Sequence, residues 1–266
     1  MSSNSLKVSV LLLAAALSLW AREPLTVCAD PQNPPFSTRQ GSGFENKIAN
    51  AIAAQLHQPV RFYWQRMGRG FVREVVNKGA CDAVIAVPVG MRGVRVTSPY
   101  YRSTYVFVTR HAEPPITSLD DPRLAHMKIG VQVLDDDYAP PARALARRSL
   151  TKNLVGFEMD ENAGEIVSAV AQKKVDTAIV WGPLAGYYAK RYRSILRLSP
   201  VTPAVDPPRL PFTFEIGVGV RKSNPELYAR LEGAVHRAEP QIQRILRAYG
   251  VPILPLLEQK QEREGQ

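Results

Sequence analysis

The fold is decided by the stretch Ser98-Pro-Tyr-Tyr-Arg-Ser-Thr-Tyr-Val-Phe-Val-Thr-Arg110, which follows one set of βα units and precedes a second. Its second half, Thr104 to Thr109, is rich in the Thr, Tyr, Val and Phe residues that favour strands. A second strand-like run, Phe212-Thr-Phe-Glu-Ile-Gly-Val-Gly-Val220, follows the second set. We interpret the two runs as strands that take the chain from one lobe into another and back. They predict an α/β protein of two lobes with a hinge and a cleft; the alternative is a pair of core strands in a single α/β domain.

The 266 residues are enough for one large domain or two small ones, and the first 21 belong to neither lobe. Lys7 gives a basic start, Val8 to Leu19 is an apolar run, and Ala21 offers a small residue for cleavage. This layout is typical of a secretory signal peptide, and the run is short for a membrane span. We therefore expect a soluble, exported protein.

Two cysteines are present, Cys28 and Cys81. In an oxidising compartment two thiols of one domain usually pair. Both lie in or at the start of strands that we expect to be parallel neighbours. We predict a Cys28–Cys81 disulfide; the alternative is two buried free thiols.

The formal net charge is +10, without a block of five or six like charges. In an exported protein this charge is compatible with an acidic partner or an anionic membrane surface, and equally with an ordinary basic surface. We expect no nucleic-acid partner.

Hydrophobic periodicity predicts similar elements in both lobes. In the first lobe we expect strands at 25–29, 60–64 and 81–87, with helices from about residue 44 and at 70–78. In the second lobe we expect strands at 127–131, 153–157 and 175–181, with helices at 138–149 and 161–173. Asn224 and Pro225 then start a last helix, which Pro240 is expected to divide from another ending near Gly250. Each lobe is thus a mainly parallel sheet flanked by helices.

These elements divide the chain into a signal peptide at 1–21, a first lobe at 22–109 and 213–257, a second lobe at 110–212, and a disordered tail at 258–266. No phosphate-binding loop, nucleophile elbow or metal-ligand spacing is present, and the four histidines lie far apart. The acidic run Asp135-Asp136-Asp137 lacks the alternating ligands of a calcium loop and precedes a predicted helix start, so we read it as capping. We expect no catalytic residue, no metal site and no cofactor.

Five motifs, taken in order and together with both cysteines, resemble a known family. They are Val27-Cys-Ala-Asp-Pro-Gln-Asn-Pro-Pro-Phe-Ser37, Gly43-Phe-Glu-Asn-Lys-Ile-Ala49, Arg69-Gly-Phe-Val-Arg73, Gly79-Ala-Cys-Asp82 and Pro99-Tyr-Tyr-Arg-Ser-Thr-Tyr-Val-Phe-Val-Thr109. The chain resembles type II periplasmic solute-binding proteins. More narrowly, it is similar to the homologues encoded beside quinoprotein alcohol dehydrogenases, the MoxJ/XoxJ type of methanol oxidation clusters.

The same resemblance shows three departures from the amino-acid receptors of this fold. Their carboxylate-binding Thr-x-x-Arg segment is replaced by Ala86-Val-Pro-Val-Gly-Met-Arg92. Their Gly-Thr turn is replaced by Val131-Gln-Val-Leu-Asp-Asp136, and their ammonium-binding Asp by Trp181. A bound zwitterion needs both charges matched in a closed cleft, so amino-acid binding is not expected.

A cleft can still be predicted from the ends of the parallel strands, where α/β proteins bind ligands. It is expected to be lined by Asp30, Asn33, Phe36, Trp64, Gln65, Arg66, Pro88, Arg92 and Trp181. Aromatic side chains with few charges suit a flat or apolar guest. For each aromatic side chain, packing between the lobes is the alternative role.

The resemblance implies a non-catalytic periplasmic accessory protein of a pyrroloquinoline quinone (PQQ)-dependent methanol or alcohol dehydrogenase, active in its maturation or activation. One alternative is a transport receptor for an uncharged or aromatic small molecule. Another is an enzyme on the same lobes, for which no suitably placed acid–base pair is visible. Neighbouring genes for a permease and an ATPase would favour the transport receptor. Neighbouring genes for a quinoprotein dehydrogenase and a cytochrome c would favour the accessory protein.

Overall fold

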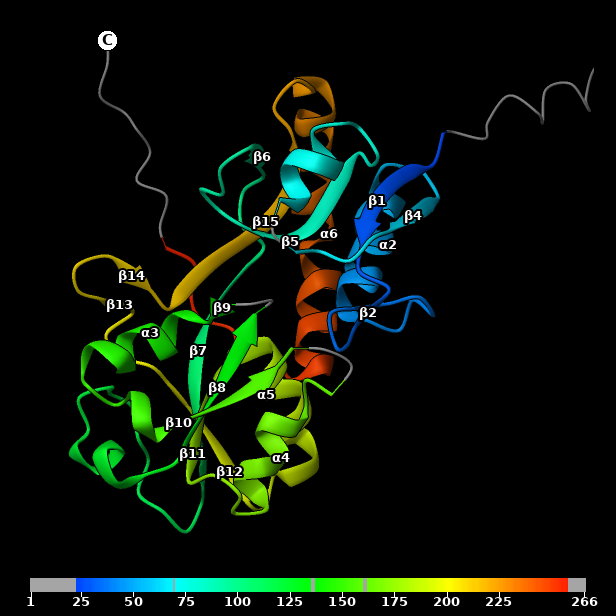
Figure 1. The fold of residues 1–266 in the computed structure, drawn as a ribbon. Helices are drawn as coiled ribbons and strands as arrows, with labels where there is room; N and C mark the ends of the chain where they lie inside the picture. Colours follow the sequence, from blue (N-terminus) through cyan, green and yellow to red (C-terminus); the bar gives the residue numbers. More distant parts are fainter. Residues whose placement is uncertain (1–22, 69, 135–136, 160–161, 258–266) are drawn as a thin grey trace, which may run out of the picture.

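The computed structural model describes residues 23–68, 70–134, 137–159 and 162–257. The predicted signal peptide and tail lie outside these residues, as do Asp135 and Asp136 of the acidic run. The ribbon shows two lobes joined by the long strands β7 (Tyr101–Arg110) and β15 (Thr213–Arg221) (Figure 1). The fold class predicted from the sequence is therefore confirmed, whereas the residue boundaries of the lobes stay a prediction.

Lobe I is built on three parallel strands, with β1 (Leu25–Ala29) between β4 (Val60–Trp64) and β5 (Ala83–Pro88). Successive side chains of a strand point to opposite faces of the sheet, so the two faces have separate cores. One core contains Val27 together with α2 (Phe44–Gln55) and α6 (Pro225–Tyr249). The other contains Cys28 and the residues around a π-helical turn.

Lobe II repeats this arrangement around the parallel strands β10 (Leu154–Glu158), β8 (Ile129–Leu134) and β11 (Thr177–Trp181). One face of its sheet packs on α3 (Pro140–Arg147). The opposite face packs on α4 (Glu165–Ala171) and α5 (Gly182–Ala189). The shorter elements are β2 (Gln32–Asn33), β3 (Ser37–Thr38), β6 (Val94–Val96), β9 (Asp137–Tyr138), β12 (Leu196–Pro200), β13 (Val205–Asp206), β14 (Leu210–Pro211), the π-helical turn Val72–Val76 and the 3₁₀ turns Pro122–His126, Thr151–Asn153 and Lys190–Tyr192.

The two crossing strands pair differently along their lengths. The first four residues of β7 pair with the start of β15, for example Arg102 with Glu215. Its remaining residues pair with β11 and β12 of lobe II. The end of β15 pairs with β5 of lobe I. One strand therefore belongs to both sheets, as the composition of the stretch 98–110 predicts.

The predicted division of the last helix at Pro240 is wrong, because α6 runs unbroken from Pro225 to Tyr249. A proline inside a helix removes one backbone hydrogen bond and costs about 3 kcal/mol. Pro240 lies on the exposed side, while Ala238 and Ile242 continue the buried stripe on either side of it. Burial of that stripe outweighs the local cost. The helix ends at Gly250 in the left-handed conformation, where the sequence predicts its end.

Smaller differences concern two other helices. The sequence predicts an α-helix at 70–78, but only the π-helical turn Val72–Val76 forms before Gly79 adopts a φ of +84°. Gly70, with a φ of +83°, stands at its start and shortens the segment. The sequence predicts a helix from Tyr138, but the backbone of Tyr138 lies in β9 and pairs with Val133 of β8, and α3 begins at Pro140.

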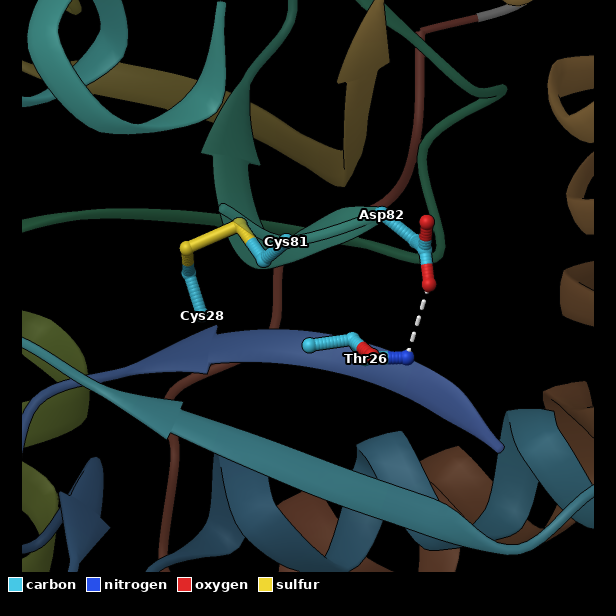
Figure 2. Close-up of a disulfide and its surroundings, with 4 residues drawn as sticks. All are labelled: Thr26, Cys28, Cys81 and Asp82. Carbon is cyan, nitrogen blue, oxygen red and sulfur yellow. Dashed lines mark hydrogen bonds between the residues drawn. A yellow bond between two sulfur atoms is a disulfide. The ribbon is translucent and has the colours of Figure 1, made fainter. Parts of the chain in front are cut away.

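The predicted disulfide is present between Cys28 of β1 and Cys81, two residues before β5 (Figure 2). The two strands are parallel neighbours, which places the Cα atoms 5.5 Å apart. Asp82 makes a second connection beside it, because its carboxylate accepts a hydrogen bond of 2.9 Å from the backbone N–H of Thr26. The described residues contain no free cysteine, so the free-thiol alternative is excluded.

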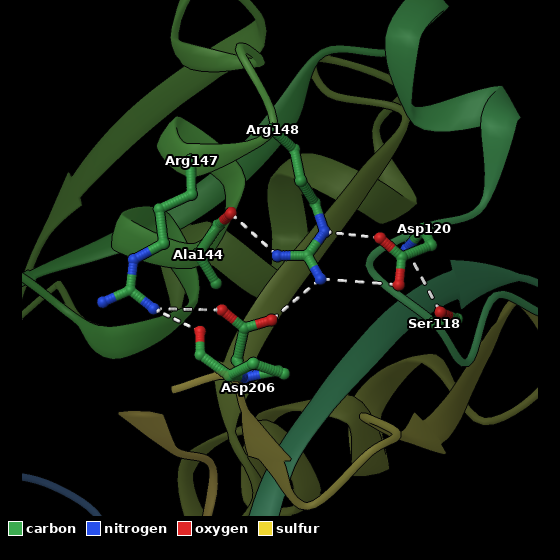
Figure 3. A network of polar contacts seen from close by, with 7 residues as sticks. Ser118, Asp120, Ala144, Arg147, Arg148 and Asp206 are labelled. Atoms are coloured by element: carbon green, nitrogen blue, oxygen red, sulfur yellow. Dashed lines mark hydrogen bonds and ion pairs between the residues drawn. The ribbon is translucent and has the colours of Figure 1, made fainter. Parts of the chain in front are cut away.

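Two arginines at the end of α3 hold the hairpin β13–β14 against lobe II (Figure 3). Asp206 of this hairpin is buried, and its carboxylate pairs with Arg148 at 2.8 Å and with Arg147 at 3.3 Å. Arg148 also pairs with Asp120 at 2.7 Å, a hydrogen bond that lowers the pKa of Asp120. A buried carboxylate is tolerated because cations and N–H groups surround it.

Candidate functional site

Asp30 fixes the loop that leaves β1 at its carboxyl end. The side chain is buried, and its two oxygens accept hydrogen bonds from the backbone N–H groups of Gln32 at 2.9 Å and Met67 at 3.2 Å. Asn33, in the short β2, accepts a hydrogen bond from the N–H of Phe36 through its carbonyl. Asp30 thus joins the loop after β1 to the loop after β4.

Trp64 ends β4 directly beside Ala29, and the residues after it are exposed. Its half-buried ring contacts Phe62 at 5.0 Å, and the guanidinium of Arg39 lies 5.7 Å from its centre. Gln65 and Arg66 continue outward, with the N–H of Gln65 bonded to the carbonyl of Ala29. These residues form a rim on lobe I.

Phe36 and Trp181, both predicted to line the cleft, pack partly buried against residues of both lobes. Phe36 packs against the main buried cluster of lobe I and against one of lobe II. Trp181 packs against the lobe I cluster and the other lobe II cluster, with its ring 5.4 Å from Tyr105 and 5.7 Å from Phe214. Both side chains therefore connect the two lobes, as in the packing alternative given above.

Gln132 holds Trp181 in place, although it is not among the site residues predicted from the sequence. It is buried in β8, and its Oε1 accepts a hydrogen bond of 2.6 Å from the backbone N–H of Trp181. Its Nε2 donates to the sulfur of Met159. A single amide in an otherwise apolar strand is a signal that could have found it, because buried polar groups need partners. Amino-acid receptors have their Gly-Thr turn here, whereas β8 continues to Leu134.

Pro88 and Arg92 flank an exposed turn at the end of β5. The N–H of Met91 donates to the carbonyl of Pro88 at 3.1 Å, and Gly90 has a φ of +83°. Arg92 is exposed just beyond this turn. The segment that replaces the carboxylate-binding motif is therefore a tight surface turn.

Beneath the rim lies a group of acidic and phenolic side chains that sequence reasoning also missed. Glu45, partly buried at the start of α2, has its pKa raised to about 8 by burial and then by the negative charge of Asp30. Burial raises the pKa values of Tyr100 and Tyr101 as well, and the negative charge of Glu45 adds to the effect in both. The hydroxyl of Tyr100 accepts a hydrogen bond from the N–H of Ala86 at 3.0 Å. No sequence pattern marks Glu45 as different from an ordinary first-turn acid.

A second set of contacts joins the lobes at the end of α6. The ring of Tyr249 stacks on Tyr187 of α5 at 5.6 Å, and its hydroxyl donates to the carbonyl of Ser42. Lys190 donates to the carbonyl of Ala248 at 2.6 Å. Gly186 lies so close to the carbonyl of Gly250 that a Cβ would overlap it. These contacts hold α5 against lobe I.

Two surface depressions lie elsewhere on lobe I. One of about 470 Å³ is lined by Pro31, Pro34 and Arg39, among others, on the outside of the loop after β1. Another of about 440 Å³ lies at the amino ends of β1 and β5, next to Thr26 and Asp82. Of the residues predicted to line the cleft, Asp30 and Asn33 lie in the loop after β1, Trp64, Gln65 and Arg66 at the end of β4, and Pro88 and Arg92 at the turn after β5. Their joint role as one cleft stays a prediction.

The described residues were compared with the requirements of a metal-ligand cluster and of a membrane-spanning helix. Among residues 23–68, 70–134, 137–159 and 162–257, no three His, Cys, Asp or Glu side chains gather as metal ligands would. Within the same ranges, no helix combines the length and apolar character that crossing a bilayer requires.

Comparison with known proteins identifies the family. Residues 25–251 match the family model described as bacterial extracellular solute-binding proteins, family 3. The chain belongs to this family. Protein MoxJ of Methylorubrum extorquens is 34% identical over 256 residues, which cover 87% of this chain and 82% of MoxJ. The chain is thus similar to MoxJ over nearly its whole described length.

Two solved structures have the same fold over their full lengths. The crystal structure of the periplasmic binding protein XoxJ from Methylobacterium extorquens AM1 has a TM-score of 0.71 and 35% identity, covering 87% of this chain and 100% of XoxJ. That of MxaJ from Methylophaga aminisulfidivorans MPT has a TM-score of 0.75 and 29% identity, covering 86% and 100%. The resemblance stated from the five motifs is confirmed.

Proposed function

We propose that this protein is a non-catalytic, periplasmic accessory protein of a PQQ-dependent methanol or alcohol dehydrogenase, which it helps to mature or activate. The observation that carries the proposal is the similarity to MoxJ, MxaJ and XoxJ along nearly the whole chain. The motifs of the dehydrogenase-associated type occur here in order, and they include both cysteines of the disulfide.

The geometry between the lobes supports a partner rather than an amino acid as the bound molecule. Trp181 stands where amino-acid receptors have an ammonium-binding acid, and it packs on both lobes. The turn at Gly90 replaces their carboxylate site. An amino acid would leave its charges unpaired in such a space, at a cost of several kcal/mol. The rim at Trp64, with Arg39 beside its ring, and the exposed Arg92 after β5 suit an extended surface of another protein.

In this proposal the quinone and the metal ion belong to the dehydrogenase, and this chain only binds the apo-enzyme. A rigid surface that fits one conformation of the apo-enzyme shifts its population towards that conformation. Loading of the quinone and the metal would then be faster, without any bond being made or broken by this chain.

The test is the activation of the apo-dehydrogenase from the same source. The apo-enzyme is mixed with PQQ and with calcium or a lanthanide, and the appearance of dye-linked alcohol oxidation is followed with and without this protein. Faster activation is expected, and Trp64→Ala is expected to reduce it. Equal rates with and without the protein would refute the accessory role.

The family itself favours one other candidate, a transport receptor for an uncharged or aromatic solute. A solute that binds only the folded protein raises its melting temperature, by an amount that grows with concentration. A thermal-shift panel of alcohols, aromatic acids and quinones therefore separates the two functions. Saturable stabilisation by one solute, without effect on the dehydrogenase, would assign the protein to transport.

A further inference from the structure

Exposed apolar side chains gather at one place beside the hinge. In the part of the chain that the structure describes, seven large hydrophobic side chains are well exposed, and four of them lie on two neighbouring segments. These are Val89 (47% exposed), Met91 (42%), Leu256 (41%) and Leu257 (59%), which we name the hinge patch. Single exposed hydrophobic residues are ordinary, whereas a group of them marks an interaction surface.

Hydrogen bonds to one residue bring the two segments together. The backbone N–H of Val89 donates to the carbonyl oxygen of Glu215 at 2.8 Å. The backbone N–H of Leu257 donates to Oε1 of the same Glu215, also at 2.8 Å. Glu215 belongs to β15, next to Phe214, whose ring contacts Trp181. The hinge patch therefore lies against the crossing strand β15.

Both segments are held in fixed conformations. Val89 and Met91 lie in the turn that Gly90 permits with its positive φ. The C-terminal segment is bonded to β7, because the N–H of Leu254 donates to the carbonyl of Arg102 at 2.8 Å and Arg102 donates to the carbonyl of Pro255 at 3.1 Å. Binding to the hinge patch would lose little further conformational entropy, which favours affinity.

The chemistry of the chain indicates what covers the hinge patch. The sequence from residue 258 to 266, Glu-Gln-Lys-Gln-Glu-Arg-Glu-Gly-Gln, contains no hydrophobic side chain that could pack there. A second copy is disfavoured because each copy carries a net charge of +10. Arg92 is exposed directly after Met91. An apolar segment flanked by carboxylates matches both the apolar residues and the positive charge.

We infer that the hinge patch is the docking surface for an apolar, acid-flanked segment of the apo-dehydrogenase. The inference rests on the proposed function and adds the surface through which this chain contacts the dehydrogenase. That surface lies on the crossing strand rather than deep between the lobes. Val89 and Met91 supply the buried centre of the contact, and Arg92 supplies its charged edge.

The test measures binding of the apo-dehydrogenase to immobilised full-length mature protein. The double variant Val89→Ser, Met91→Ser is expected to raise the dissociation constant at least tenfold. The matched control is Ile195→Ser, which removes an equally exposed side chain (43%) at the far end of β7, beside His111. Ile195 is about 30 Å from Arg102 along this strand, at about 3.3 Å per residue. Arg92→Glu is expected to slow association several-fold at low salt, with the difference disappearing in 0.5 M salt.

The outcomes separate the inference from the proposed function. If the unsubstituted protein binds and the double variant binds within twofold of it, the hinge patch is wrong and the accessory role stands. If the unsubstituted protein does not bind, the accessory role fails, and the inference fails with it. If the double variant instead changes the sedimentation of the protein alone, the hinge patch joins two copies, which overturns the inference. Circular dichroism confirms that each variant is folded before it is compared.

Discussion

Glu45 is expected to make the stability of the protein fall as the pH rises. Burial and the charge of Asp30 raise its pKa from 4.5 to about 8. Below pH 4.5 the carboxyl group is neutral in both states and has no effect. Between pH 4.5 and about 8 the folded state keeps a proton that the unfolded chain releases. The free energy of unfolding therefore decreases with rising pH in this window.

The size of the effect follows from the width of the window. One retained proton changes the free energy of unfolding by at most about 1.4 kcal/mol per pH unit. Over the whole window this gives an upper limit of about 5 kcal/mol. The side chain is only partly buried, so water stabilises some of the charge, and we expect about 2–3 kcal/mol.

The perturbation is Glu45→Gln, which keeps the shape of the side chain and removes its titration. Urea unfolding at pH 5, 6, 7 and 8.5, followed by tryptophan fluorescence, gives the free energy of unfolding for both proteins. Relative to the parent, the variant should gain less than about 1 kcal/mol at pH 5 and about 2–3 kcal/mol at pH 8.5. The matched control is Glu226→Gln, which changes an exposed acid in the first turn of α6.

A constant difference between Glu45→Gln and the parent protein across these pH values would refute the reasoning. It would mean that the carboxyl group of Glu45 is hydrated in the folded state. The space beneath the rim of Asp30 and Trp64 would then be open to water. Such a result would also support the transport alternative, which needs an accessible site there.

Three further experiments test the fold. Cys28→Ser with Cys81→Ser should lower the free energy of unfolding by about 4 kcal/mol, from the 53-residue separation in the chain-entropy model; a loss under 1 kcal/mol would contradict it. Pro240→Ala should raise the melting temperature, because alanine restores a backbone donor inside α6 and gains up to about 3 kcal/mol; a lower melting temperature would show that Pro240 shapes the helix. Asp206→Ala should cost about 3 kcal/mol in urea unfolding and Asp120→Ala under 1, because only Asp206 is buried; equal costs would argue against the buried pair.

The sequence predicts those strands that are determined by their own residues and by the residues directly flanking them. The apolar runs of β1 and β4 lie between polar or proline residues, and the structure ends both strands where the sequence predicts. The cysteine pair follows from the expected parallel neighbours. The crossing strand is visible because β-branched and aromatic residues fill the second half of the stretch 98–110.

Tertiary packing decides the features that the sequence could not give. Pro240 is a local helix-breaking signal, but buried residues on both sides keep α6 continuous. The packing of Trp181 on both lobes depends on the pairing of β11 with β7, which the sequence alone does not show. Glu45 resembles any first-turn acid until the neighbouring loop buries it.

The central claim is that this solute-binding fold binds a dehydrogenase, and gel filtration with light scattering tests it most directly. The mature protein is mixed with the apo-dehydrogenase from the same source, and the mass of each peak is measured at low and at 0.5 M salt. The account predicts a co-eluting complex at low salt whose amount falls at high salt. Separate elution of the two proteins at low salt would contradict the account.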